Sequence, residues 1–373
     1  MRIILTGGGT AGHVNPAIAI AEIIKSNISG AEILYVGTPN GMERRLIGEV
    51  GYPYYPIRSM GFARTLSLKN LKALWIAVSA PKKAKKLLTE LKPDLVVGTG
   101  GYVCWPILSA AASLGIPCAI HESNAFPGLT VRRLARRVDT VMLNFAEAER
   151  ELKGAKRVAL VGNPLRNGFK TENREEARKA LGIPDDARLV VSFGGSLGAE
   201  AINRAILALF KEYTARSDSK IHHIHGCGRR YFDAFSQSVK TEIGTLPKGV
   251  RYYEYLTNMP SLMAAADLVI CRAGAMTISE IARSGRASIL IPSPNVANDH
   301  QTKNALSRQR AGAALLLREN ELSRLPACVH TLLSDEKARK EMEAAAAAFH
   351  TINAEHAVYN ELMRLLKSKK RQT

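Results

Sequence analysis

The feature that most constrains the fold of this chain is a glycine loop that occurs twice, each time between an apolar run and a helical pattern. Residues 2–18 read RIILTGGGTAGHVNPAI, and residues 188–206 read RLVVSFGGSLGAEAINRAI. In both segments a β-branched run leads into Gly-Gly-[Thr/Ser]-x-Gly and then into a helix. Similar runs alternate with helical patterns along the rest of the chain, which is typical of parallel α/β layers. The sequence therefore predicts an α/β protein with two doubly wound domains.

The chain length and a break in this alternation indicate the domain boundaries. A length of 373 residues fits two domains, and Asn163-Pro164 interrupts the pattern between the two series. We expect a first domain over residues 1–163 and a second over residues 164–345. A C-terminal helix over residues 346–373 should follow and end in a basic tail.

The charge of the chain indicates an anionic partner. Lysine and arginine number 52 against 33 acidic residues, which gives a net charge of +19. Such a charge suits nucleic acid, a phosphorylated ligand or an acidic membrane face. A basic strand interleaved with aromatic residues does not occur, so we expect no nucleic-acid partner.

Cysteine usage and apolar stretches indicate the cellular compartment of the chain. Five cysteines without a C-x-x-C pair predict neither a disulfide framework nor a zinc ribbon, and they fit a reducing cytoplasm. Too few residues precede the first glycine loop for a signal peptide. The uncharged stretch 95–120 could cross a bilayer by its length. Glycines and prolines interrupt it, so we expect a buried strand–helix–strand unit and no transmembrane segment.

The sequence requires no cofactor or metal. Gly7, Gly9 and Gly12 match the dinucleotide pattern G-x-G-x-x-G. That pattern needs an acid at the end of the second strand, and the first acid after that strand is Glu43. Neither a P-loop Gly-Lys-[Ser/Thr] nor an Asp-x-Asp clamp for a metal–diphosphate occurs. A His-His-Ile-His run at residues 222–225 lacks further ligands at metal spacing.

Three features carry candidate chemistry. N–H groups at a helix start after a glycine loop suit a phosphate or an oxyanion, and His13 follows the first loop directly. His13 is either a capping or packing residue or a general base. Glu280, in the segment CRAGAMTISE, either caps a helix start or accepts the ribose hydroxyls of a nucleotide. The polar cluster 298–305 lies where a strand end meets a helix, as ligand sites of α/β sheets do.

Seven motifs occur in order over nearly the whole chain: GGGTAGHVNPA, VGTGGYVCWP, HESNAFPGLTVRR, VGNPLR, GGSLGA, CRAGAMTISE and NDHQTKNA. Together they resemble the MurG family of peptidoglycan N-acetylglucosaminyltransferases. The resemblance implies a GT-B fold, in which two Rossmann-like domains face one another across a cleft. It also implies an acceptor site in the first domain, a donor site in the second, and a C-terminal helix that returns to the first.

The resemblance further implies the reaction. A member of this family is an inverting hexosyltransferase that moves N-acetylglucosamine from UDP-N-acetylglucosamine to the 4-hydroxyl of undecaprenyl-pyrophosphoryl-N-acetylmuramyl-pentapeptide (lipid I), which gives lipid II. This step belongs to peptidoglycan synthesis, on which cell wall biogenesis, cell shape and cell division depend. The alternative is a sugar-nucleotide epimerase of GT-B architecture, because such an enzyme would use the same UDP site.

The resemblance assigns roles motif by motif. His13 would be the catalytic base, Ser196 would hold the UDP phosphates, and Glu280 would bind the ribose. The backbone of Leu256 would meet the uracil, and Gln301 would touch the sugar hydroxyls with the adjoining His300. The donor-binding residues that the resemblance implies are Thr10, Ala11, Gly12, Asn124, Arg166, Ser196, Leu256, Ala275, Met276, Thr277, Ile278, Ser279, Glu280 and Gln301.

The chain departs from the family pattern at three of these motifs. Ala11 replaces a glycine, and a positive φ at an alanine would cost about 1 kcal/mol. Leu197 replaces a glutamine in the second glycine loop, which should remove one hydrogen bond to the donor. Ser123 replaces a glutamine in the HESN motif.

A basic segment predicts contact with an anionic membrane. Leu71, Leu74 and Trp75 recur at helical spacing and form an apolar stripe, and a lysine cluster follows: Lys82, Lys83, Lys85 and Lys86. The alternative is an ordinary amphipathic helix whose lysines are its solvated face. We expect peripheral binding at the cytoplasmic face of the plasma membrane. The expected partners are UDP-N-acetylglucosamine, the undecaprenyl-linked acceptor, the anionic membrane surface and other cell-wall synthesis proteins.

Overall fold

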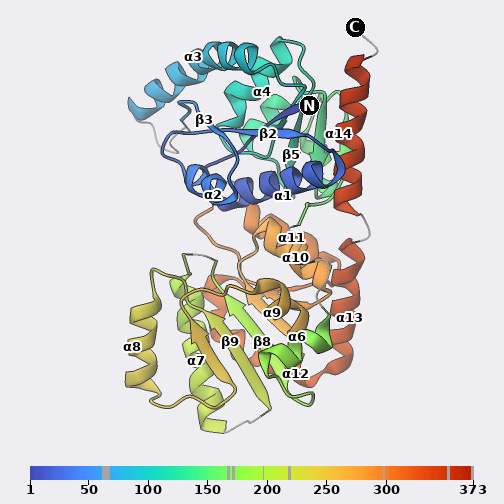
Figure 1. The fold of residues 1–373 in the computed structure, drawn as a ribbon. Helices are drawn as coiled ribbons and strands as arrows, with labels where there is room; N and C mark the ends of the chain where they lie inside the picture. The colour runs from blue at the N-terminus through green and yellow to red at the C-terminus, as the bar shows by residue number, and fades with distance from the viewer. Residues whose placement is uncertain are drawn as a thin grey trace. The chain divides into compact units, whose positions relative to one another are not determined.

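The computed structural model describes residues 1–60, 68–165, 169, 173–195, 197–216, 220–296, 299–350 and 353–370. The chain divides into two compact units (Figure 1), which are described separately below. Unit 1 comprises Met1–Arg166 and Ile352–Thr373, and unit 2 comprises Asn167–Thr351.

In the described part of unit 1, seven parallel strands form one sheet in the order β3-β2-β1-β4-β5-β6-β7. Their bounds are β1 (Arg2–Thr6), β2 (Glu32–Gly37), β3 (Tyr54–Pro56), β4 (Leu95–Gly98), β5 (Cys118–Glu122), β6 (Thr140–Leu143) and β7 (Val158–Leu160). Strands β4, β5 and β6 are buried along their whole length because helices cover both faces of the sheet. Thr6 pairs with Gly98, so β1 and β4 end level at the point where the strand order reverses.

Two layers of helices enclose this sheet. On one face lie α1 (Ala11–Asn27), α2 (Met42–Val50) and α14 (Ala354–Lys370), and on the other lie α3 (Leu68–Leu91), α4 (Cys104–Ser113) and α5 (Leu129–Leu134). A 3-10 turn, η1 (Ala146–Glu151), precedes β7. The C-terminal helix α14 packs beside α1 (Figure 1), with Val358 and Leu362 in the core. The buried carboxylate of Glu361 fixes α14 by accepting hydrogen bonds from Thr140 and Arg157.

Unit 2 repeats the same topology. Its described strands pair in parallel in the order β10-β9-β8-β11-β12-β13. They are β8 (Arg188–Phe193), β9 (Ile221–Gly226), β10 (Val250–Tyr253), β11 (Leu268–Cys271), β12 (Ala287–Leu290) and β13 (Leu315–Leu316). The helices are α6 (Arg174–Leu181), α7 (Glu200–Arg216), α8 (Phe232–Glu242), α9 (Met259–Ala265), α10 (Ala275–Ser284), α11 (His300–Arg310), α12 (Leu325–Ser334) and α13 (Glu336–Ala347), with 3-10 turns η4 (Glu319–Arg324) and η5 (Ala348–His350).

Each unit is thus a doubly wound, Rossmann-like α/β sheet, and the predicted fold class is confirmed. The strand order reverses between β1 and β4 in unit 1 and between β8 and β11 in unit 2. Ligands of open α/β sheets bind outside the carboxyl ends of the strands at such a reversal. No helix in the part of the chain that the structure describes is both long and apolar enough to cross a membrane.

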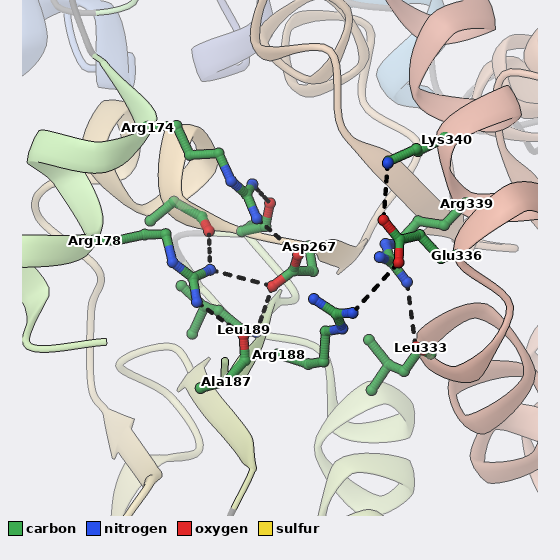
Figure 2. Close-up of polar contacts among 12 residues, drawn as sticks. Arg174, Arg178, Ala187, Arg188, Leu189, Asp267, Leu333, Glu336, Arg339 and Lys340 are labelled. Atoms are coloured by element: carbon green, nitrogen blue, oxygen red, sulfur yellow. Dashed lines mark hydrogen bonds and ion pairs between the residues drawn. The ribbon is translucent and has the colours of Figure 1, made fainter. Parts of the chain in front are cut away.

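A buried ion cluster closes the opposite, amino-terminal edge of the sheet in unit 2 (Figure 2). The Asp267 carboxylate, just before β11, accepts from Arg174 at 2.7 Å, from Arg178 at 3.3 Å and from the Leu189 backbone N–H at 2.8 Å. Arg178 also donates to the carbonyl of Ala187 at 2.8 Å. Because this carboxylate is saturated by its own unit and lies away from the loops, it stabilises the fold rather than binding a ligand.

We predict that D267A lowers the free energy of unfolding by about 3–5 kcal/mol, because it leaves the buried Arg178 guanidinium without its counter-charge. The matched control is E336Q, since Glu336 pairs with Arg188 and Lys340 at an exposed position of the same unit. Urea denaturation should show a large loss for D267A and almost none for E336Q. Equal midpoints for the two variants would contradict the structural role of Asp267.

Candidate functional site

The loop after β1 and the loop after β4 touch through their backbones at the strand reversal of unit 1. The Gly8 N–H donates to the Gly100 carbonyl at 3.3 Å. Gly101 has a φ of +83°, and a Cβ there would overlap the Gly8 carbonyl oxygen. Glycine is therefore required at Gly101 both by conformation and by space.

His13, in the first turn of α1, points its imidazole back onto these loops. Its Nδ1 lies 2.9 Å from the Gly8 carbonyl oxygen. Since a carbonyl only accepts, Nδ1 carries the proton and Nε2 keeps its lone pair. The ring lies over Gly100, where a Cβ would come within 2.6 Å of Cδ2. An imidazole held in this tautomer is able to take a proton from a hydroxyl at Nε2.

The expected strain at Ala11 is wrong. Helix α1 begins at Ala11, so this residue has helical backbone angles. Among the described residues other than glycine, positive φ occurs at Lys92 and Asp299. The preceding Thr10 is extended and exposed, and its Oγ1 lies 3.3 Å from Nδ1 of His13. Gly12 is exposed as well.

The loop after β5 is shaped by Glu122, a residue that sequence analysis did not single out. The Glu122 carboxylate accepts from the backbone N–H and the side-chain Nδ2 of Asn124, both at 2.9 Å, and from the Gly128 N–H at 2.9 Å. Ser123 accepts through its carbonyl from Nδ2 of Asn144 at 3.1 Å. Glu122 thereby fixes the side chain of Asn124, and an acid at a strand end was the only signal for it.

In unit 2 the loop after β8 is equally tight. Gly198 has a φ of +83°, and a Cβ there would overlap the carbonyl oxygen of Cys227 in the loop after β9. Leu197 is 68% exposed, so its side chain points away from the core. Ser196 and Arg166 lie outside the described residues, and their roles stay predictions.

The start of α10 offers backbone donors without a side-chain cap. Gly274 is the N-cap residue in an extended conformation, and as a glycine it supplies no side-chain cap. The first-turn N–H groups of Met276 and Thr277 therefore suit an anion such as a phosphate. The segment is otherwise packed inward, since Ala275, Ile278 and Ser279 are buried.

Glu280 does not cap this helix. Because α10 begins at Ala275, Glu280 lies in the second turn, and the capping interpretation is wrong. Its half-buried carboxylate accepts no hydrogen bond from any residue that the structure describes. Burial raises the pKa of Glu280 to about 7. A desolvated acid without a protein partner, beside an uncapped helix start, is the pattern of a binding residue.

Amide and guanidinium groups join the loops after β11 and β12 and the start of α11 at this sheet edge. Gln301 accepts from the Ser293 N–H at 2.8 Å, which leaves its NH2 group as a donor. The buried Asn304 donates to the Ala273 carbonyl at 3.3 Å. Arg272 donates to the carbonyl of Pro292 at 3.1 Å. The side chain of Gln301 is thus oriented by the loop after β12.

Leu256 lies in the loop after β10. Its side chain packs on Gly226, where a Cβ would come within 2.9 Å of the leucine Cγ. Neither its N–H nor its C=O pairs with another backbone group in the described part of the chain, so both remain available to the edge of a ligand base.

The histidine run on β9 forms a buried polar network. Ser192 Oγ lies 2.7 Å from both Nε2 of His223 and Nδ1 of His225, and Nε2 of His225 lies 3.1 Å from Oδ1 of Asn203. Asn203 in turn donates to the Cys227 carbonyl at 3.0 Å. Burial lowers the pKa of His225 to about 3. These imidazoles connect the sheet to the start of α7 and hold the neighbouring loops.

We predict that the affinity for UDP-N-acetylglucosamine, the donor that the resemblance implies, falls as Glu280 is protonated. Only the carboxylate accepts two ribose hydroxyls, and the pKa of about 7 places the transition at neutral pH. Kd should rise about tenfold between pH 8 and pH 6. E280Q should bind weakly with a flat profile. Calorimetric titration of both proteins measures this, and an unchanged pH dependence in E280Q would remove Glu280 from the ribose site.

Two family descriptions match the chain. Residues 3–143 match the glycosyltransferase family 28 N-terminal domain, and residues 189–358 match the glycosyltransferase family 28 C-terminal domain. Among solved structures, the chain resembles MurG of Acinetobacter baumannii, with a TM-score of 0.78 and 28% identity over 97% of this chain and 99% of that one. A UDP-GlcNAc 2-epimerase from Neisseria meningitidis has a TM-score of 0.67 at 14% identity, over 98% of this chain and all of that one, which shows a shared fold alone.

Curated relatives match over their whole length. The chain is 41% identical to the UDP-N-acetylglucosamine–N-acetylmuramyl-(pentapeptide) pyrophosphoryl-undecaprenol N-acetylglucosamine transferase of Acetivibrio thermocellus, over 99% of both proteins. A protein of the same name from Thermoanaerobacter sp. (strain X514) is 41% identical over 99% of this chain and 100% of its own length. This chain belongs to glycosyltransferase family 28.

Proposed function

We propose that this glycosyltransferase moves N-acetylglucosamine from UDP-N-acetylglucosamine to the 4-hydroxyl of lipid I, which gives lipid II. The observation that carries the proposal is the Glu280 carboxylate, which has no hydrogen-bond partner among the described residues and lies near the start of α10, where the N-cap is a glycine. It is a nucleotide-binding arrangement in a chain that is 41% identical over its whole length to enzymes named for this transfer.

The donor would bind through unit 2. The first-turn N–H groups of α10 donate hydrogen bonds to the diphosphate, and the positive end of the helix dipole stabilises its charge. Glu280 accepts the ribose hydroxyls, the backbone of Leu256 pairs with the uracil, and the oriented NH2 group of Gln301 donates to the sugar. The proposal needs no metal, because backbone donors take the place of a cation on the diphosphate.

The reaction is a single displacement. The acceptor 4-hydroxyl attacks the anomeric carbon of the donor, and Nε2 of His13 takes the hydroxyl proton. The bond from the anomeric carbon to the UDP oxygen breaks on the opposite face, so an α-linked donor gives a β-linked product. Negative charge grows on the leaving diphosphate, where preorganised N–H donors stabilise the transition state more than the ground state.

We predict that wild-type protein releases UDP from UDP-N-acetylglucosamine only when a lipid I analogue is present. H13A should lower kcat by about two to four orders of magnitude, because the attacking hydroxyl loses its base, while the donor KM changes little. A coupled assay for UDP measures both parameters. A kcat within tenfold of wild type would make His13 a packing residue. Acceptor-independent conversion of the donor to its C2 epimer would instead show the alternative activity.

We also infer that unit 1 binds peripherally to the anionic cytoplasmic face of the plasma membrane, where the lipid anchor holds the acceptor. The side chains of Leu71, Leu74 and Trp75 lie outside the described part of the structure. In the second half of α3, Ala84 and Leu88 are buried in the core, whereas the lysine cluster is exposed. The helix therefore packs on the sheet as the alternative interpretation expects, and its solvated face carries the charge.

A basic groove in the same unit supports this inference. It has a volume of about 540 Å³ and is lined by residues of α5 and the segment after it, by Trp105 of α4, and by Glu151 and Lys153. Its lining residues are Trp105, Leu129, Arg132, Arg133, Arg136, Arg137, Glu151 and Lys153. Leu129 is 48% exposed, so an apolar side chain stands among cations, which suits the boundary between lipid head groups and acyl chains.

Replacing the lysine cluster tests the membrane role. Each lysine near an anionic surface contributes about 1 kcal/mol, so we expect K82E/K83E/K85E/K86E to abolish co-sedimentation with anionic vesicles and to leave donor binding intact. The control changes four exposed lysines of unit 2 to glutamate and has the same net charge: K179E/K240E/K248E/K337E. If co-sedimentation with the vesicles falls equally in both variants, the net charge of the protein rather than this surface is responsible for binding.

A further inference from the structure

We propose that Glu43 is a positioning residue for His13, which it holds through the peptide group between Gly8 and Gly9. This assignment rests on the proposed function, in which His13 is the base. Glu43 lies in the first turn of α2 and is fully buried. It was noted in the sequence only as an acid too late in the chain for a dinucleotide site.

The Glu43 carboxylate accepts hydrogen bonds from two loops rather than capping its own helix. It accepts from the Thr38 N–H at 3.0 Å, from the Thr38 hydroxyl, and from the Gly9 N–H at 3.3 Å. No side chain caps α2. Burial by itself would raise the pKa of Glu43, but the hydrogen bonds from Thr38 and the backbone outweigh it and lower the pKa below its usual value. The group is therefore an anion at neutral pH.

Three glycines make room for this carboxylate. A Cβ at Gly8, Gly37 or Gly41 would come closer than 3.0 Å to side-chain atoms of Glu43. None of the three has a positive φ, so their backbone conformation does not require glycine. At Gly8 and Gly41 the buried acid occupies the space that a side chain would need, and at Gly37 the acid and the ring of Tyr54 occupy it together.

The link to His13 is a single planar peptide. The N–H of Gly9 donates to Glu43, and the carbonyl of Gly8, on the other side of the same peptide bond, accepts from Nδ1 of His13. Because the peptide is rigid, fixing its N–H fixes the direction of its carbonyl. A carboxylate on the N–H also polarises the peptide and strengthens the bond that the carbonyl accepts. Glu43 thus holds the tautomer in which Nε2 is the free base.

The same contact occupies a backbone donor of the dinucleotide-like first loop. In a dinucleotide site the N–H groups of such a loop face a phosphate. Here the Gly9 N–H already has an anionic partner from the protein. Of the glycines in this loop, Gly8 is the one whose missing side chain leaves room for the carboxylate.

The test compares E43A with wild type in the transfer assay. We expect kcat to fall about 10- to 100-fold as the imidazole loses its fixed orientation, with the donor KM within about threefold. Acetate should occupy the space that the Glu43 side chain leaves and raise the kcat of E43A by about tenfold. E361A is the matched control, a buried carboxylate of the same unit that binds Thr140 and Arg157. It should show no rescue by acetate.

A second readout needs no activity. Nitrogen-15 NMR of labelled histidine, with the His13 signals identified by their loss in H13Q, should report the Nδ1–H tautomer in wild type and a tautomer mixture in E43A. If E43A does not fold, E43Q keeps the size and removes the charge, and the same fall in kcat at unchanged KM is expected. An unaltered tautomer, a kcat within threefold of wild type, or a parallel rise in KM would overturn the assignment. An inactive wild type with the Nδ1–H tautomer would refute the proposed function and leave the Glu43 contact standing.

Discussion

Parallel pairing of every described strand decides where the candidate residues lie. In a parallel sheet all carboxyl ends meet at one edge, and β1 with β4, like β8 with β11, end level. Loops that are ninety residues apart in sequence therefore come into backbone contact, as Gly8 and Gly100 do. Such an approach is possible only without side chains, which explains why glycines gather at these strand ends.

The hydrogen bonds that a buried carboxylate accepts from the protein distinguish residues that shape the site from the candidate binding residue. Glu43 and Glu122 are buried carboxylates whose oxygens accept backbone hydrogen bonds from neighbouring loops. Each accepts three hydrogen bonds from its own unit and thereby holds the shape of the loops. Among the described residues, Glu280 is a carboxylate without such partners, and it lies beside an uncapped helix start. A desolvated acid is costly to the fold, so its retention points to a partner supplied from outside.

Much of this could be predicted from the sequence. Short β-branched runs that end in glycine predicted both sheets, and the loop repeat predicted their common topology. The role of Glu280 could not be decided, because that depended on whether the helix begins at Ala275 or Thr277. Helix boundaries are set by cap geometry rather than by apolar periodicity. The contact of Glu43 was invisible for another reason, since it joins α2 to the β1–α1 loop across the sheet edge and leaves no periodic pattern.

The proposed function requires an inverting transfer by one displacement, in which His13 would be the base and N–H groups at the start of α10 would hold the leaving diphosphate. The most direct measurement is the anomeric configuration of the disaccharide formed from UDP-N-acetylglucosamine and a soluble lipid I analogue, read from the anomeric proton coupling by NMR. We expect a β-linked product from the α-linked donor. An α-linked product would contradict this proposal, because retention requires either a covalent intermediate or attack from the face of the leaving group.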